Sequence, residues 1–177
     1  GAWQVAVAPS AGGEPRIVKR GAGTGHDCYG AVFSSDGASF FCQDLDALIE
    51  VGIDGTERGR TKLAPLLGTA GVNSGARLAP SADGKTLLLD VDLDEDANLP
   101  GWDGPAPAIF SIDLAAKTAR RVSPAKQLVW QPAWLDAGHI LCVTQGKGDR
   151  APAVARLGLD GKPPVRLVPN GRLPSAA

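Results

Sequence analysis

Short runs of apolar residues alternate with polar turns along the whole chain. Three of these runs are SFFC at 39–42, TLLLDV at 86–91 and HILCV at 139–143. Short apolar runs bounded by turn residues are typical of strands that are buried on both faces. No segment keeps a 3.6-residue periodicity, and the stretch LAPLLGTAG at 63–71 predicts at most one helical turn. The pattern therefore predicts an all-β protein.

A four-stranded unit recurs three times. Each copy has an apolar strand, a turn with aspartate, a second apolar strand and a hairpin around another aspartate, and Asp-Gly supplies the positive φ of tight turns. The aspartates of the first turn are Asp36, Asp83 and Asp136, with steps of 47 and 53 residues. Those of the second are Asp54, Asp113 and Asp160, with steps of 59 and 47 residues. Such periods with four strands each predict the blades of a β-propeller.

The predicted blades cover 28–63, 73–123 and 129–168, within one partial propeller over 1–177. Residues 1–20 match only the last two strands of the repeat and predict a half blade. A closed propeller usually has four to eight blades. We therefore expect self-association or a partner chain that completes the propeller, with a self-sufficient open arc as the alternative.

The repeats resemble the TolB-like family of β-propellers, whose blade motif is Pro-x-Trp-Ser-Pro-Asp-Gly-Lys before an apolar strand. The copies that carry the resemblance are APSADGKTLLLDVD at 79–92, QPAWLDAGHILCV at 131–143 and, more loosely, VFSSDGASFFC at 32–42. In the 131–143 copy, Asp136 is followed by Ala-Gly instead of Gly-Lys. The resemblance implies a periplasmic or extracellular interaction platform, or a propeller that gates a fused peptidase.

Charge and composition exclude other partners. The net charge is -1, with 18 basic and 19 acidic residues, so the basic surplus of a nucleic-acid binder is missing. No apolar run reaches the length of a membrane span, and we expect no membrane insertion. Of the three cysteines, Cys42 and Cys142 occupy equivalent positions in two repeats and are interpreted as small core residues. A disulfide of Cys28 is left open.

The sequence predicts no catalytic residue and no cofactor. A nucleophile elbow requires Gly-x-Ser-x-Gly, and the segment GVNSG at 71–75 has the wrong spacing. His139 begins a predicted core strand, which favours a structural role. His26 and Cys28 are close in sequence, but a reactive pair also needs a pocket and a lowered thiol pKa.

An acidic insertion, DVDLDEDANLPGWDG at 90–104, lies between the second and third strands of one blade. Asp92, Asp94, Asp96 and Asn98 have the spacing of the early ligands in a calcium loop. The glycine and distal glutamate of an EF-hand are absent, so no metal site is predicted, and a solvated loop is the alternative. Trp102 in this insertion is a candidate contact residue, because tryptophan is enriched at interfaces.

Trp130 and Trp134 are four residues apart in a predicted strand, which places them on one face. They either pack in the core or form a ligand-facing pair. The candidate ligand-binding residues are thus Asp92, Asp94, Asp96, Trp102 and Trp130.

We expect a non-catalytic module that presents its loops to a protein or peptide, since loops on a rigid scaffold carry recognition. Two alternatives stay open. One is the accessory propeller of a hydrolase, and the other is a carbohydrate- or cation-binding propeller.

Overall fold

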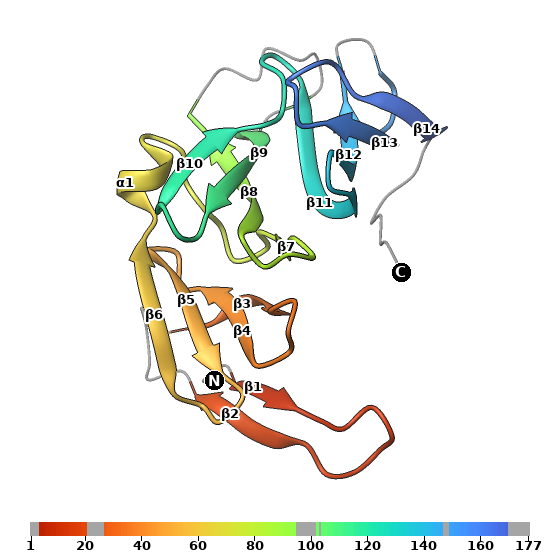
Figure 1. Ribbon diagram of the computed structural model, residues 1–177. Helices are drawn as coiled ribbons and strands as arrows, with labels where there is room; N and C mark the ends of the chain where they lie inside the picture. Colours follow the sequence, from red (N-terminus) through yellow and green to blue (C-terminus); the bar gives the residue numbers. More distant parts are fainter. Residues whose placement is uncertain (1–3, 21–26, 95–101, 103, 147–148, 170–177) are drawn as a thin grey trace.

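The computed structural model describes residues 4–20, 27–94, 102, 104–146 and 149–169. Within these residues, the strands form one two-stranded and three four-stranded antiparallel sheets, and each strand pairs with its neighbours in sequence (Figure 1). The predicted all-β class, with three four-stranded repeats after an N-terminal half blade, is confirmed. No helix among the described residues is long and apolar enough to cross a membrane.

The N-terminal hairpin consists of β1 (Gln4–Val7) and β2 (Arg16–Arg20). The first blade consists of β3 (Tyr29–Phe33), β4 (Ser39–Gln43), β5 (Ala47–Gly52) and β6 (Glu57–Lys62). A single helical turn, α1 (Ala64–Leu67), follows it, as the sequence predicts. The second blade consists of β7 (Leu78–Pro80), β8 (Thr86–Leu93), β9 (Ala106–Asp113) and β10 (Thr118–Arg121). The third consists of β11 (Leu128–Asp136), β12 (His139–Gln145), β13 (Ala153–Gly158) and β14 (Val165–Pro169).

The repeated aspartates stabilise the hairpin turns. In the first blade, a carboxylate oxygen of Asp36 accepts the Ala38 N–H at 2.9 Å and the Ser34 hydroxyl at 2.7 Å. These bonds hold the pKa of Asp36 below its usual value. The other repeat aspartates each accept the backbone N–H two residues ahead; they are Asp54, Asp83, Asp113, Asp136 and Asp160. This local bond stabilises a turn without help from the rest of the fold, which is why the repeat is visible in the sequence.

The blades stand side by side in an arc, with β3, β7 and β11 on its concave side (Figure 1). The inner strand β3 of the first blade comes very close to the segment that precedes β7. A Cβ added to Gly30 on β3 would lie 2.7 Å from the carbonyl oxygen of Ala76, and Gly30 has a φ of 64°. Only glycine fits this position without strain.

Three apolar clusters join the neighbouring sheets. One contains Val18 of the N-terminal hairpin and Ile49 of the first blade. Leu48 and Leu87 belong to the cluster that the first and second blades share. The cluster between the second and third blades includes the fully buried residues Leu88, Val129 and Ile140. Both faces of β8 are therefore buried, as its continuous apolar run predicts.

A bulge in β11 overturns the prediction that Trp130 and Trp134 share a face. Trp130 lies opposite Val143 and Trp134 opposite Ile140, so four steps on β11 match three steps on β12. The extra residue reverses the alternation of side chains, and Gln131 within the bulge has a φ of 55°. Trp134 packs in the cluster between the second and third blades, and its indole N–H donates to the Ala79 carbonyl at 2.9 Å.

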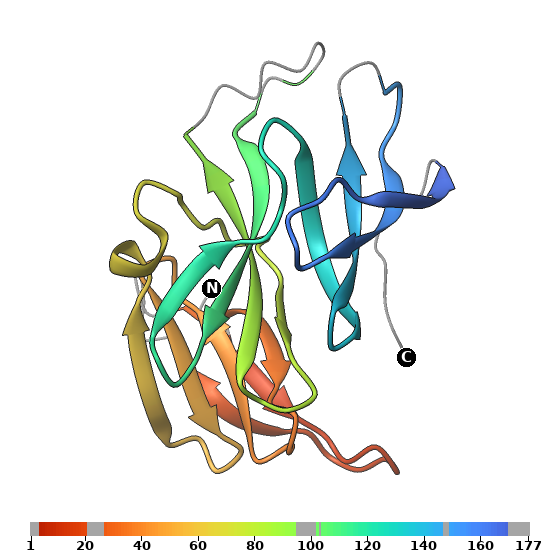
Figure 2. The same cartoon turned by 45° about the horizontal axis from the view of Figure 1, so that its top comes forward.

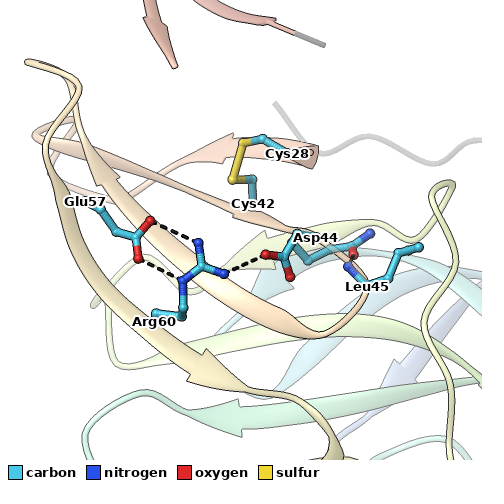
Figure 3. Close-up of a disulfide and its surroundings, with 7 residues drawn as sticks. Cys28, Cys42, Asp44, Leu45, Glu57 and Arg60 are labelled. Atoms are coloured by element: carbon cyan, nitrogen blue, oxygen red, sulfur yellow. Dashed lines mark hydrogen bonds and ion pairs between the residues drawn. A yellow bond between two sulfur atoms is a disulfide. The ribbon is translucent and has the colours of Figure 1, made fainter. Parts of the chain in front are cut away.

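Cys42 is a buried core residue, as the sequence predicts, and it is also the partner in the disulfide that the sequence left open for Cys28. The disulfide joins Cys28 and Cys42 across a Cα–Cα distance of 5.2 Å (Figure 3). The pairing of β3 with β4 explains this, because Tyr29 lies opposite Gln43 and brings the preceding cysteine beside Cys42. The third cysteine, Cys142, is free and buried.

A carboxylate–guanidinium network lies in the same blade as the disulfide (Figure 3). Arg60 on β6 binds Asp44 at 2.6 Å and Glu57 at 2.8 Å. The other oxygen of Asp44 accepts the backbone N–H of Ala47 at the start of β5. Because the Asp44 side chain is almost completely buried, we assign this network to the tight β4–β5 turn and not to a ligand site.

Candidate ligand-binding site

A cleft of about 300 Å³ is lined by residues of the second and third blades. These two blades lie side by side, with β8 and β9 of the second next to β11 of the third (Figure 2). The described residues that form it come from the segment before β7, from the second half of β8, from Trp102 and the start of β9, and from the bulge of β11. Its main polar and aromatic lining residues are Asn73, Asp90, Asp92, Trp102, Trp130 and Gln131. We name this feature the tryptophan cleft.

Asp90 is the most unusual residue of the tryptophan cleft. Its side chain projects from β8 at the interface with β11, and the residue is only 9% exposed. One carboxylate oxygen, Oδ2, accepts the backbone N–H of Gln131 at 2.9 Å. The other, Oδ1, makes no hydrogen bond of ordinary geometry with any described residue. A buried polar atom without a partner is rare, and in native structures it often marks a functional site.

Burial raises the pKa of Asp90 to about 7, because the desolvated site disfavours the charged carboxylate. The backbone N–H groups of Gln131 and Arg77 and the charge of Arg77 act in the opposite direction, but the loss of hydration is the larger effect. The carboxyl group therefore changes its protonation state near neutral pH.

Asp92 lies two residues further along β8, on the same face as Asp90. Its Oδ2 accepts the side-chain amide of Asn73 at 2.7 Å. Its backbone N–H and carbonyl both bond to Gly71, at 2.9 and 2.7 Å. The side-chain bond to Asn73 and the main-chain bonds to Gly71 fix the segment before β7 against β8. This segment forms one wall of the cleft.

Two tryptophans from different blades meet in the tryptophan cleft. The ring centroids of Trp102 and Trp130 are 6.0 Å apart, with 42° between the ring planes. The indole N–H of Trp102 donates to the Pro105 carbonyl at 2.9 Å, which fixes the ring within its own connection. Trp130 is the last paired residue of β11 before the bulge, where it lies opposite Val143. Both rings are partly buried, so each leaves some apolar surface accessible.

The structure brings together three of the five residues that the sequence singled out, namely Asp92, Trp102 and Trp130. Asp94 follows the end of β8 and is exposed, and it does not line the cleft. Asp96 lies outside the described residues. Among those described, no three His, Cys, Asp or Glu side chains are grouped closely enough to hold a metal ion.

Sequence reasoning missed Asp90, Asn73 and Gln131. A signal for Asp90 was present, because alternation along TLLLDVDL places it on the face of Leu88, which is fully buried. An aspartate at a buried strand position needs an explanation. The local sequence does not predict the roles of Asn73 and Gln131, because each donates a hydrogen bond to an aspartate of β8 that is distant in sequence.

The candidate catalytic residues do not assemble a reactive pair in the described residues. Cys28 is bonded to Cys42, and His26 lies outside the described part of the chain. His139 is partly buried at the start of β12, and its Nδ1 lies 2.9 Å from a carboxylate oxygen of Asp136 in the preceding turn. This contact matches the structural role that the sequence favours for His139.

Two further grooves are present. One, of about 640 Å³, separates the second and third blades at the opposite end and is lined by Arg120, Trp134 and Leu159 among others. The other, of about 680 Å³, follows the concave side along β3, β7 and β11. Gly75 and Ala76 line both this concave groove and the tryptophan cleft. Neither groove combines an aromatic pair with a buried carboxylate.

Comparisons with solved structures identify the fold. An oligogalacturonate lyase from Vibrio parahaemolyticus matches with a TM-score of 0.62 at 13% identity, over 86% of this chain and 42% of that one. A puromycin-hydrolysing peptidase from Mycobacterium tuberculosis matches with a TM-score of 0.56 at 20% identity, over 88% of this chain and 24% of that one. The chain therefore spans less than half of the length of either protein.

TolB from Acinetobacter baumannii also matches, with a TM-score of 0.43 at 15% identity, over 97% of this chain and 50% of that one. No protein-family model matches the sequence, and no curated protein matches it. The likeness is thus one of fold: this chain carries the blades of a β-propeller and shares their arrangement with proteins of different activities.

Proposed function

We propose that this chain is a non-catalytic binding module that recognises a protein or peptide partner at the tryptophan cleft. The observation that carries the proposal is the meeting of Trp102 and Trp130 beside a buried carboxylate oxygen that accepts no hydrogen bond of ordinary geometry from a described residue. Tryptophan is the side chain most enriched among residues that dominate binding energies. A small apolar cleft with a few polar groups at fixed positions is also the usual form of a recognition site.

The rigidity of the cleft supports recognition. Asp92 bonds to both Asn73 and Gly71 in the segment before β7, and the Trp102 indole N–H donates to the Pro105 carbonyl. A site that is already ordered loses less conformational entropy when a partner binds. The three walls come from separate segments of a packed scaffold, which is the general arrangement of binding loops.

A second candidate is an accessory propeller of a hydrolase whose catalytic part lies outside this chain. The match to the puromycin-hydrolysing peptidase favours it, since this chain corresponds to only 24% of that protein. In that case the concave groove would face the catalytic part. A longer form of the chain with serine-hydrolase activity, lost when the propeller is deleted, would support this candidate over an independent module.

A carbohydrate ligand is the third possibility, because sugars stack on exposed tryptophan rings. Asp90 and Asp92 argue against acidic sugars, since like charges repel in a desolvated site.

The disulfide supports a periplasmic or extracellular location, because disulfides form and persist in oxidising compartments. We also infer that the sheet of the third blade is covered by another chain or by a second copy. Val165, Leu167 and Val168 on its outermost strand are each about half exposed, and unpaired strand edges favour association.

The test of the proposed function is a selection of random peptides displayed on phage against the immobilised chain. We expect enriched peptides whose affinity falls about tenfold or more in Trp102→Ala, which corresponds to about 1.4 kcal/mol. The matched control is Arg120→Ala, which alters the groove at the opposite end. The absence of enrichment, or enriched peptides that bind Trp102→Ala as well as the unaltered chain, would refute the proposal.

A further inference from the structure

The described lining of the tryptophan cleft is acidic. Asp90 and Asp92 both face it, and among the described residues no lysine or arginine lines it. The positive charge of Arg77 lowers the pKa of Asp90, but Arg77 is exposed and lines the adjacent concave groove. A desolvated carboxylate is stable only when it is paired or protonated. A partner that supplies positive charge would stabilise the charged form of these carboxylates.

The unpartnered oxygen of Asp90 is an independent indication. Oδ2 accepts the Gln131 N–H, and no described residue donates a hydrogen bond of ordinary geometry to Oδ1. Oδ1 is itself buried, so a donor that binds it must enter between β8 and β11. Asp92 differs, because Asn73 already donates to it. A cationic donor would gain more from Asp90 than a neutral hydroxyl, since charge-assisted hydrogen bonds are roughly twice as strong as neutral ones.

The aromatic pair is suited to the same ligand. The rings of Trp102 and Trp130 are tilted with respect to each other by 42°, so they do not stack face to face. The face of each ring carries partial negative charge. A cation within about 6 Å of a tryptophan face is attracted by the ring quadrupole. An aliphatic stem would pack on the rings while its charged end reaches the carboxylates.

Size limits what can enter. The volume of about 300 Å³ is at the lower limit of small-molecule pockets, which suits one long side chain better than a folded surface. We infer that the tryptophan cleft binds the positively charged side chain, lysine or arginine, of a peptide segment in the partner, with Asp90 as its main acceptor. This inference rests on the proposed function, because it names the chemistry that the partner presents to the same cleft.

The experiment uses four pentapeptides with acetylated and amidated ends, of the form Gly-Gly-X-Gly-Gly, where X is lysine, arginine, norleucine or glutamate. A fifth peptide has norleucine at X and a free N-terminus, which separates a terminal ammonium from a side chain. Binding is followed by the indole N–H resonances of the ¹⁵N-labelled chain, which has four tryptophans. Trp102→Phe and Trp130→Phe variants assign the two resonances of the cleft.

We expect saturable shifts of both cleft resonances with the lysine or the arginine peptide, and affinity at least about tenfold weaker for norleucine and glutamate. Asp90→Asn should weaken binding of the cationic peptide about tenfold, whereas Asp46→Asn, an exposed aspartate of the β4–β5 turn, should not change it. If Asp90→Asn does not fold, Trp102→Leu replaces it and should cause a similar loss. The heteronuclear spectrum of each variant reports its folding.

Several results would overturn the inference. Equal binding of the norleucine and lysine peptides at the cleft would show a site that is not selective for charge, and the proposed function would stand without it. Binding of only the peptide with a free N-terminus would assign the cleft to chain ends. If no peptide shifts the two resonances while the peptides selected by phage display still bind there, the cationic preference is wrong but the binding face is right.

Discussion

The carboxylate of Asp90 accepts the backbone N–H of Gln131 at 2.9 Å, which joins the second blade to the bulge of β11. The two residues are 41 positions apart, and the bond forms only because the bulge turns an amide toward β8. This contact holds the carboxylate beside Trp130 and also leaves its second oxygen without a described partner. The stability of the blade interface and the proposed binding site thus depend on the same residue.

Asp90 should make the stability of the chain depend on pH. Its pKa is raised by burial from 3.8 to about 7, so the folded chain holds this proton more tightly than the unfolded chain. The stability contributed by the protonated carboxyl is therefore complete below about pH 4 and is lost as the pH rises through about 7. Arg77 and Asp92 are the other charged groups near it, and Arg77 limits the loss.

Asp90→Asn removes this titration. The difference in free energy of unfolding between the variant and the unaltered chain should shift in favour of the variant by about 2–4 kcal/mol between pH 4 and pH 8. Urea unfolding at several pH values measures it, with Asp46→Asn as the control. A constant difference across this range would mean that the Asp90 carboxyl is not buried in solution.

The disulfide between Cys28 and Cys42 should contribute about 2–4 kcal/mol to stability, because it restricts the unfolded chain. Urea unfolding of the Cys28→Ser, Cys42→Ser double variant should show this loss relative to the oxidised chain. The reducing agent dithiothreitol should lower the stability of the unaltered chain and leave the double variant unchanged. An equal effect of the reductant on both proteins would contradict the pairing.

Cys142 should be inert in the folded chain. It is buried, and burial raises the pKa of its thiol to about 12, so almost none of it is thiolate at neutral pH. A colorimetric thiol reagent at about pH 8 should detect no reactive thiol in the folded chain and one per chain after denaturation in guanidinium chloride. Three thiols after denaturation would show that the disulfide does not form.

Trp134 should act in stability and not in binding. It is partly buried between the second and third blades, with its indole N–H bonded to Ala79. Trp134→Ala should cost about 2–4 kcal/mol in urea unfolding, somewhat below the loss for a fully buried aromatic residue. Trp134→Phe should recover most of it. A loss below about 1 kcal/mol would place Trp134 on the surface and make the opposite groove the better binding site.

Local chemistry explains how much of this fold is readable from the sequence. The aspartates of the repeat bond to N–H groups only two residues away, so their turns are encoded within a few residues, and the buried strands follow from their apolar runs. The bulge at Gln131 is different. Gln131 has a positive φ, although it is neither a glycine nor an asparagine, the residue types that would indicate such a conformation in the sequence. The bulge also reverses the face of β11 on which Trp134 lies.

The candidate site was predicted only in part, because only some of its features are encoded locally. Trp102 and Asp92 could be selected as unusual residue types in an insertion. That Trp130 from the next blade would meet them, and that Asp90 would be left with an unused oxygen, depends on how β11 packs on β8. The sequence left a disulfide of Cys28 open but did not identify Cys42 as its partner, because Cys28 lies just before a strand whose register the sequence alone does not determine.

The most direct test of the central claim is to locate a bound peptide by intermolecular nuclear Overhauser effects. An unlabelled peptide from the phage selection is added to the isotope-labelled chain. We predict contacts between peptide protons and the indole protons of Trp102 and Trp130, and their loss in Trp102→Ala. Contacts to Trp134 and Leu159 instead, in the groove at the opposite end of the blades, would contradict the assignment of the tryptophan cleft as the binding site.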